Sequence, residues 1–96
     1  MNNKFDISEF VNTPTEQSVT DKLVLRFKTR RKEAKVTQTE LSKRSGVSYA
    51  SIRRFEKTGE ISLSSLIKIA HALGYLEDFD LLFKTEKIDN LKDYKI

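Results

Sequence analysis

The chain has 96 residues, fewer than the usual domain of about 100–150, so it supplies one compact domain with tails and no large enzyme fold. It contains no cysteine and one histidine, which excludes a disulfide framework and a zinc site with several such ligands. The first residues lack the apolar core of a signal peptide, and no apolar run approaches the roughly 18 residues of a membrane span. We therefore expect a cytoplasmic protein.

The net charge of +4 is unevenly distributed along the chain. Residues 22–57 carry a net charge of +9, whereas the two flanking segments together carry −5. A basic segment of this kind is where a polyanion such as nucleic acid binds. Charge runs are also typical of solvated helical faces, so the clustering alone leaves both interpretations open.

Three parts are expected along the chain: an N-terminal arm (1–17), a helical domain (18–83) and a charged tail (84–96). The arm contains the only proline, Pro14, and short apolar alternation that fits an edge strand, a docking arm or disorder. The tail is either a frayed end or a segment that pairs with another chain.

Helical periodicity begins at about Ser18. Leu23, Phe27 and the stem of Arg31 recur at i, i+4 and i+8, which predicts a first helix that ends near Ala34.

A second helix is predicted to begin after Thr37, because Thr37 and Glu40 have the spacing of a capping box. It presents Leu41 inward. Gly46 ends it, since glycine adopts a positive φ without steric cost.

Three further helices are predicted. Ser48 caps a third over Tyr49–Lys57, and Ser62 caps a fourth that runs to the stop signal Gly74. A fifth, short helix is expected over Leu76–Phe83. The sequence therefore predicts an all-α bundle of about five helices. Its expected buried residues are Leu23, Phe27, Leu41, Val47, Ile52, Phe55, Leu66, Ile69, Ala70 and Leu73.

The second and third helices are short and are joined by Ser45-Gly46-Val47-Ser48, which is the physical description of a helix-turn-helix. This stretch resembles the lambda-repressor-like family of helix-turn-helix regulators, also called the Cro/repressor or Xre type, and the resemblance covers about residues 20–83. The residues that match the family pattern are Gln38, Leu41, Gly46, Ile52 and Glu56.

One departure from the family pattern is Ser42, where the family usually has alanine packed beneath the recognition helix. Its hydroxyl is expected to bond back to a carbonyl one turn earlier, so the fold tolerates it.

A recognition helix enters the major groove of double-stranded DNA by its first turns, so its outward residues are candidates for base contacts. Those candidates are Tyr49, Ala50, Arg53 and Arg54. The resemblance assigns base reading to all of these but Arg53, and Arg54 is the best candidate because its fork fits the two acceptors of guanine. Both arginines are alternatively ordinary solvated side chains.

Phosphate contacts are expected around the same helix. The resemblance assigns them to Gln38, Ser48, Ser51 and Lys57, and Lys43 and Arg44 are further candidates.

The resemblance also implies that Glu56 is structural and pairs with Arg31 of the first helix. His71 has no second ligand-type neighbour at helical spacing, so we expect no metal. No glycine-rich phosphate loop or cysteine nucleophile is present, so the sequence favours no enzyme activity and no cofactor.

The leading hypothesis is a nucleoid-associated transcriptional repressor that binds a palindromic operator as a homodimer. The expected dimer interface is Leu76, Leu81, Leu82 and Phe83. The alternative is the antitoxin of a toxin–antitoxin module, which binds a toxin protein and autoregulates its operon. A third hypothesis, a scaffold that has lost DNA binding, is disfavoured by the charge of +9.

Overall fold

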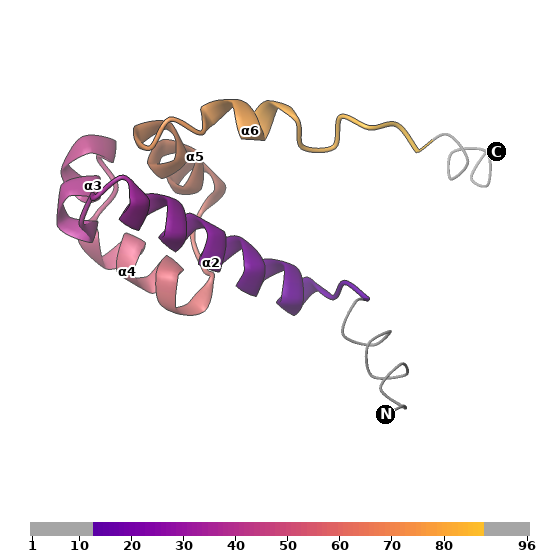
Figure 1. Cartoon of the computed structure of the whole chain (residues 1–96), viewed down its shortest axis with the longest axis horizontal. Coiled ribbons are helices and arrows are strands. Elements are labelled where there is room, and N and C mark those ends of the chain that lie inside the picture. Colours follow the sequence, from indigo (N-terminus) through magenta and orange to yellow (C-terminus); the bar gives the residue numbers. More distant parts are fainter. Residues whose placement is uncertain (1–12, 88–96) are drawn as a thin grey trace.

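The computed structural model describes residues 13–87, and that range contains five helices and no strand (Figure 1). The predicted all-α class is confirmed. The first 12 residues of the predicted arm and the tail from residue 88 lie outside the described range. The helices are α2 (Glu16–Glu33), α3 (Gln38–Ser45), α4 (Tyr49–Thr58), α5 (Leu63–Ala72) and α6 (Leu76–Asp80).

The helix starts follow side-chain caps. The capping box of α3 is confirmed, because Thr37 Oγ1 accepts the amide of Glu40 at 3.0 Å and Glu40 Oε1 accepts the amide of Thr37 at 2.8 Å. The predicted caps of α4 and α5, Ser48 and Ser62, are confirmed as well. The first helix, α2, begins at Glu16, two residues earlier than expected, with Thr15 as its N-cap.

An aliphatic residue precedes each of the three later caps, and another lies at the fourth position of the helix that follows. This is the spacing of a hydrophobic staple, which fixes the angle at which the chain enters a helix. All six of these residues belong to the core or pack against it. The pairs are Val36 with Leu41, Val47 with Ile52, and Ile61 with Leu66.

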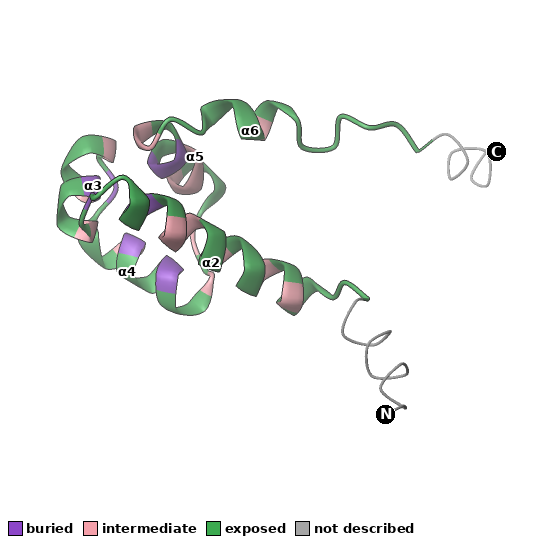
Figure 2. Cartoon of the chain, in the orientation of Figure 1, coloured by how far each residue is buried: buried purple, intermediate pink, exposed green. Residues whose placement is uncertain are grey.

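The core lies where α2, α3, α4 and α5 meet (Figure 2). The half-buried Phe27 packs edge to face against the buried Phe55, with ring centroids 5.4 Å apart. Six of the ten predicted core residues are buried, and Val36, in the connection before α3, is a seventh that the periodicity missed. The buried apolar residues are Val36, Leu41, Val47, Ile52, Phe55, Ile69 and Ala70.

Four of the predicted core residues are less buried than expected. Phe27, Leu66 and Leu73 are half-buried, and the prediction for Leu23 is wrong, since 37% of it is exposed. Leu23 lines an open groove beside the core, so no helix covers its outer side.

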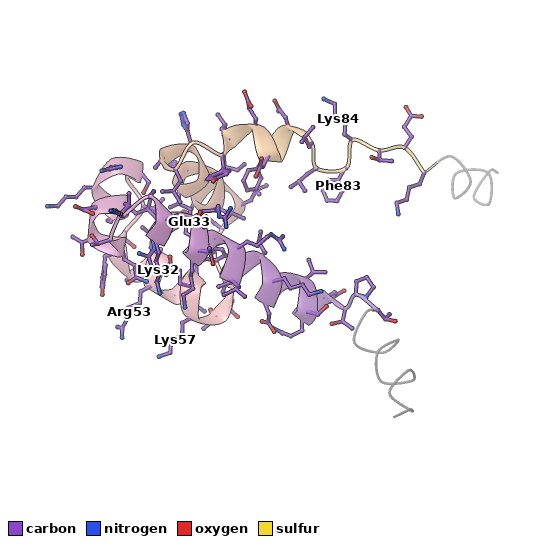
Figure 3. All side chains as sticks on the ribbon, viewed as in Figure 1. Lys32, Glu33, Arg53, Lys57, Phe83 and Lys84 are labelled. Atoms are coloured by element: carbon purple, nitrogen blue, oxygen red, sulfur yellow. The ribbon has the colours of Figure 1, made fainter. Side chains whose placement is uncertain are left out.

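The last helix is shorter than predicted. It ends at Asp80, and the chain turns through residues 81–83. Phe83 has a φ of 61° and is 98% exposed, so the turn directs this ring into solvent (Figure 3).

Candidate nucleic-acid interface

The α4 helix has two distinct faces. Ile52, Phe55 and Glu56 are buried against the rest of the bundle, while the side chains on the other face are exposed. Arg53 and Lys57 project away from the body of the molecule (Figure 3). The exposed residues of α4 are Tyr49, Ala50, Arg53, Arg54, Lys57 and Thr58. An α-helix with a basic face of this kind fits the major groove of DNA.

A buried ion pair fixes α4 to α2. Arg31 Nε donates to Glu56 Oε2 at 2.7 Å, and Arg31 Nη2 donates to Glu56 Oε1 at 2.8 Å, so both carboxylate oxygens are used. Arg31 Nη1 donates to the carbonyl of Val36 at 2.9 Å, and Gln38 Nε2 donates to Glu56 Oε1 at 2.9 Å. The network therefore joins α2, the connection after it, α3 and α4.

The charge state of Glu56 follows from these contacts. Burial alone would raise the pKa of its carboxyl, but the hydrogen bonds from Arg31 and Gln38 and the charge of Arg31 outweigh burial and lower that pKa. The hydrogen bond with Glu56 raises the pKa of Arg31 in turn. Both side chains are thus charged at neutral pH, and each buried charge has its partner.

Gln38 has a role inside the domain that the sequence did not reveal. Its side-chain amide is half-buried and donates to Glu56, so this nitrogen is engaged within the bundle. A phosphate contact by Gln38 stays a prediction. The residue lies in the first turn of α3, and its contact with Glu56 helps to position α4.

The two arginines of α4 are held differently. Arg54 Nη2 pairs with Glu60 in the connection after α4, and both side chains are about two-thirds exposed, at 67% and 64%. Arg53 has no ion-pair partner among residues 13–87. One guanidinium nitrogen of Arg54 is therefore engaged by Glu60, whereas Arg53 has no such pair within the described residues.

Four of the residues predicted to contact phosphates lie at the start of α4 or in the last turn of α3. Ser48 caps the helix by accepting the amide of Ser51 at 3.1 Å, and the two hydroxyls are 2.9 Å apart. Lys43 and Arg44 are exposed in the last turn of α3. The structure thus brings the predicted base-contacting and phosphate-contacting residues together around the two helices of the helix-turn-helix.

Ser42 stabilises the turn between these two helices. Its hydroxyl donates to the carbonyl of Val47 at 2.6 Å, so the expected bond to a carbonyl one turn earlier is wrong. Gly46 in the same turn has a φ of 79°, which is the left-handed conformation predicted for it. The serine therefore ties α3 to the connection that leads into α4.

Among residues 13–87, no group of three or more side chains is placed to hold a metal ion, and His71 is exposed. Within the same range, no helix has the length and apolar character needed to span a bilayer.

Comparison with known proteins agrees with this geometry. A family model described as Helix-turn-helix matches residues 27–79, which is more than half of the chain and contains α3, α4 and α5 completely. No curated protein and no solved structure matches the chain significantly. The chain belongs to the lambda-repressor-like, Xre-type helix-turn-helix family, whose domain is that of DNA-binding transcription regulators.

Proposed function

We propose that the protein is a transcriptional repressor that occupies a palindromic operator as a homodimer. The observation that carries this proposal is the exposed basic face of α4 on a helix locked in place by the buried Arg31–Glu56 pair. A rigid recognition helix loses little conformational entropy when it binds, so little of the free energy of its DNA contacts is offset by ordering. Those contacts then contribute to affinity and specificity. Occupation of an operator by this surface excludes other proteins from the same DNA.

The base contacts are assigned to the first turns of α4, with Arg53 and Arg54 beside Tyr49 and Ala50. The exposed cations around them, Lys43, Arg44 and Lys57, are assigned to phosphates. Phosphate contacts supply affinity for any duplex, and base contacts supply the choice of sequence.

Two-fold symmetry is part of the proposal. One recognition helix contacts few base pairs, and a second copy doubles the specific contacts on a palindrome. Exposed apolar residues at the start of α6 and in the turn after it support the dimer, because exposed apolar patches are typical of association surfaces. The proposed dimer surface is Leu76, Leu81, Leu82 and Phe83. Phe83 lies far from Arg53 and Lys57, so this surface leaves the basic face accessible (Figure 3).

The test is selection of binding sites from a random duplex pool, followed by light scattering of the protein on the enriched site. We expect a palindrome with half-sites about 10 base pairs apart and two protein chains on each duplex. An asymmetric site occupied by one chain would contradict the dimer. A co-transcribed protein that binds the α6 surface and tightens operator binding would favour the antitoxin alternative instead.

A further inference from the structure

An apolar groove of about 530 Å³ lies between α2 on one side and α5 and α6 on the other. It stays open because α6 packs on α5 and, among the described helices, has no contact with α2. The buried Phe55 and Ala70 line it, together with Leu23, Leu63 and Leu82, which remain exposed. Apolar side chains that gather in this way on the surface of a small domain indicate a site that another segment covers.

Two arginines set the charge of the groove. Arg26 and Arg30 lie one helical turn apart on α2, and Asp78 is the one acidic residue among the lining residues. Arg30 pairs with the exposed Glu33 at 3.1 Å, and Arg26 has no ion-pair partner among residues 13–87. The groove thus favours an occupant that is both apolar and acidic.

One segment outside the described residues has this composition. Residues 5–11 read Phe-Asp-Ile-Ser-Glu-Phe-Val, which gives four apolar residues, two acidic residues and no basic residue. The C-terminal stretch outside the described range, residues 88–96, carries two aspartates and two lysines and therefore has no net charge. Charge complementarity with Arg26 and Arg30 therefore selects residues 5–11.

The length of the chain allows this segment to reach the groove. Leu23 and Phe27 lie seven and eleven residues after Glu16, or about 10–17 Å along α2 at 1.5 Å per residue. An extended segment of eight residues, 5–12, spans up to about 26 Å. Pro14 and the extended N-cap residue Thr15 do not continue α2, so the chain is free to reverse its direction there.

The described start of α2 and the chain after α6 both extend away from the α3–α4 pair (Figure 1). We propose that residues 5–11 fold back and dock in the groove of the same chain, with their apolar side chains on its lining and Asp6 and Glu9 facing Arg26 and Arg30. The docked arm covers the open flank of the core. This proposal is independent of DNA binding, and Leu82 is the single residue shared by the groove and the proposed dimer surface.

The absence of cysteine provides a direct test, because Ser8→Cys takes a single nitroxide label in the full-length chain. With uniform nitrogen-15 labelling, we expect the amide signals of Phe27, Ala70 and Leu82 to lose at least about half of their intensity relative to the reduced label. The signal of Arg44, in α3, should keep its intensity. Unchanged signals from the groove residues would overturn the proposal.

Two further samples separate the alternatives. Charge reversal at both arginines, Arg26→Glu with Arg30→Glu, should restore the groove signals, whereas the matched control Arg44→Glu should leave them broadened. Broadening that survives the double charge reversal would overturn the assignment of the acidic residues. In a mixture of spin-labelled nitrogen-14 chains and unlabelled nitrogen-15 chains, we expect no broadening. Broadened groove signals in that mixture would assign the arm to a second copy and overturn docking within one chain.

Discussion

Glu56 accepts two hydrogen bonds from Arg31 across the boundary between α2 and α4, and both side chains are buried. The two residues are 25 positions apart in the chain, so their pairing fixes the tertiary position of α4. A buried carboxylate with two partners is held in one orientation, so loss of this pair should affect both the stability of the domain and the position of α4.

Replacing Glu56 by glutamine should lower the free energy of unfolding by about 3 kcal/mol near neutral pH, because Arg31 then lacks its counter-charge. The lowered pKa of Glu56 means that its contribution is fully present above its ordinary value of 4.5 and is lost as pH falls through the folded-state value. Urea unfolding of both proteins at about pH 7 and about pH 3 measures this. The difference in stability between the two proteins should be smaller at about pH 3 than at about pH 7.

The matched control is Glu33→Gln, which removes an exposed partner of Arg30 and should change stability by less than about 0.5 kcal/mol. A difference between wild type and Glu56→Gln that stays constant across this pH range would contradict the assigned role of the pair.

Ile52→Ala should cost about 2–5 kcal/mol, because Ile52 is fully buried and its truncation leaves a cavity between α4 and the core. The exposed Leu25 provides the comparison, and Leu25→Ala should stay within about 0.5 kcal/mol of wild type. Chemical denaturation of wild type and the two variants measures their free energies of unfolding. Equal midpoints for Ile52→Ala and wild type would show that the core is assigned incorrectly.

Gly59→Ala should destabilise the domain more than Gly46→Ala. Both glycines have positive φ, which costs alanine about 1–2 kcal/mol. A Cβ at Gly46 meets nothing within 4 Å, whereas one at Gly59 would overlap Cγ2 of Thr20, which adds about 1–3 kcal/mol of overpacking. Thermal unfolding of the two variants measures the difference.

The Thr20→Ser background tests the cause of this difference. Serine removes the methyl group and keeps the hydroxyl that donates to the carbonyl of Glu16. In that background Gly59→Ala and Gly46→Ala should cost nearly the same. An undiminished difference would show that the contact with Thr20 is not responsible.

Local patterns predict most of the fold. The starts of α3, α4 and α5 depend on a capping residue and the residues that follow it, and these signals lie within a few positions of each other. The burial of Val36 was also predictable, because its spacing from Leu41 is that of a hydrophobic staple. The periodicity of helices overlooks it, since Val36 is in a connection.

Features that depend on how helices end and pack were harder to predict. The exposure of Leu23 follows from the absence of contact between α2 and α6 among the described residues, and no periodicity contains that information. Likewise, the pairing of Arg54 with Glu60 depends on the left-handed turn at Gly59, which brings the chain back beside α4. The resemblance identifies Glu56 as structural and pairs it with Arg31, but it does not show that Glu56 also accepts a hydrogen bond from Gln38.

Lys57→Ala should weaken binding to an operator and to a scrambled duplex by the same factor, because a phosphate contact is independent of sequence. The slope of log affinity against log salt should become shallower by about one unit for the contact that is lost. Fluorescence anisotropy at several salt concentrations measures both quantities. Lys84→Ala, which removes an exposed lysine beside Phe83 and far from α4, is the control and should leave the slope unchanged (Figure 3). A loss confined to the operator would instead assign Lys57 to base reading.

Arg54→Ala should cost about 1–3 kcal/mol on the operator and little on scrambled DNA, as expected when a two-point contact with guanine is removed. The exposed pair with Glu60 competes with that contact, and an exposed pair contributes at most about 1 kcal/mol. Glu60→Gln should therefore raise operator affinity by up to about fivefold, because it frees the guanidinium and removes a negative charge beside the DNA.

In the Arg54→Ala background, the gain in operator affinity from Glu60→Gln should shrink, since there is no guanidinium left to release. If Glu60→Gln raises affinity equally with and without Arg54, its effect is general electrostatics. Base reading then passes to Arg53, whose side chain is unpaired within the described part of the chain.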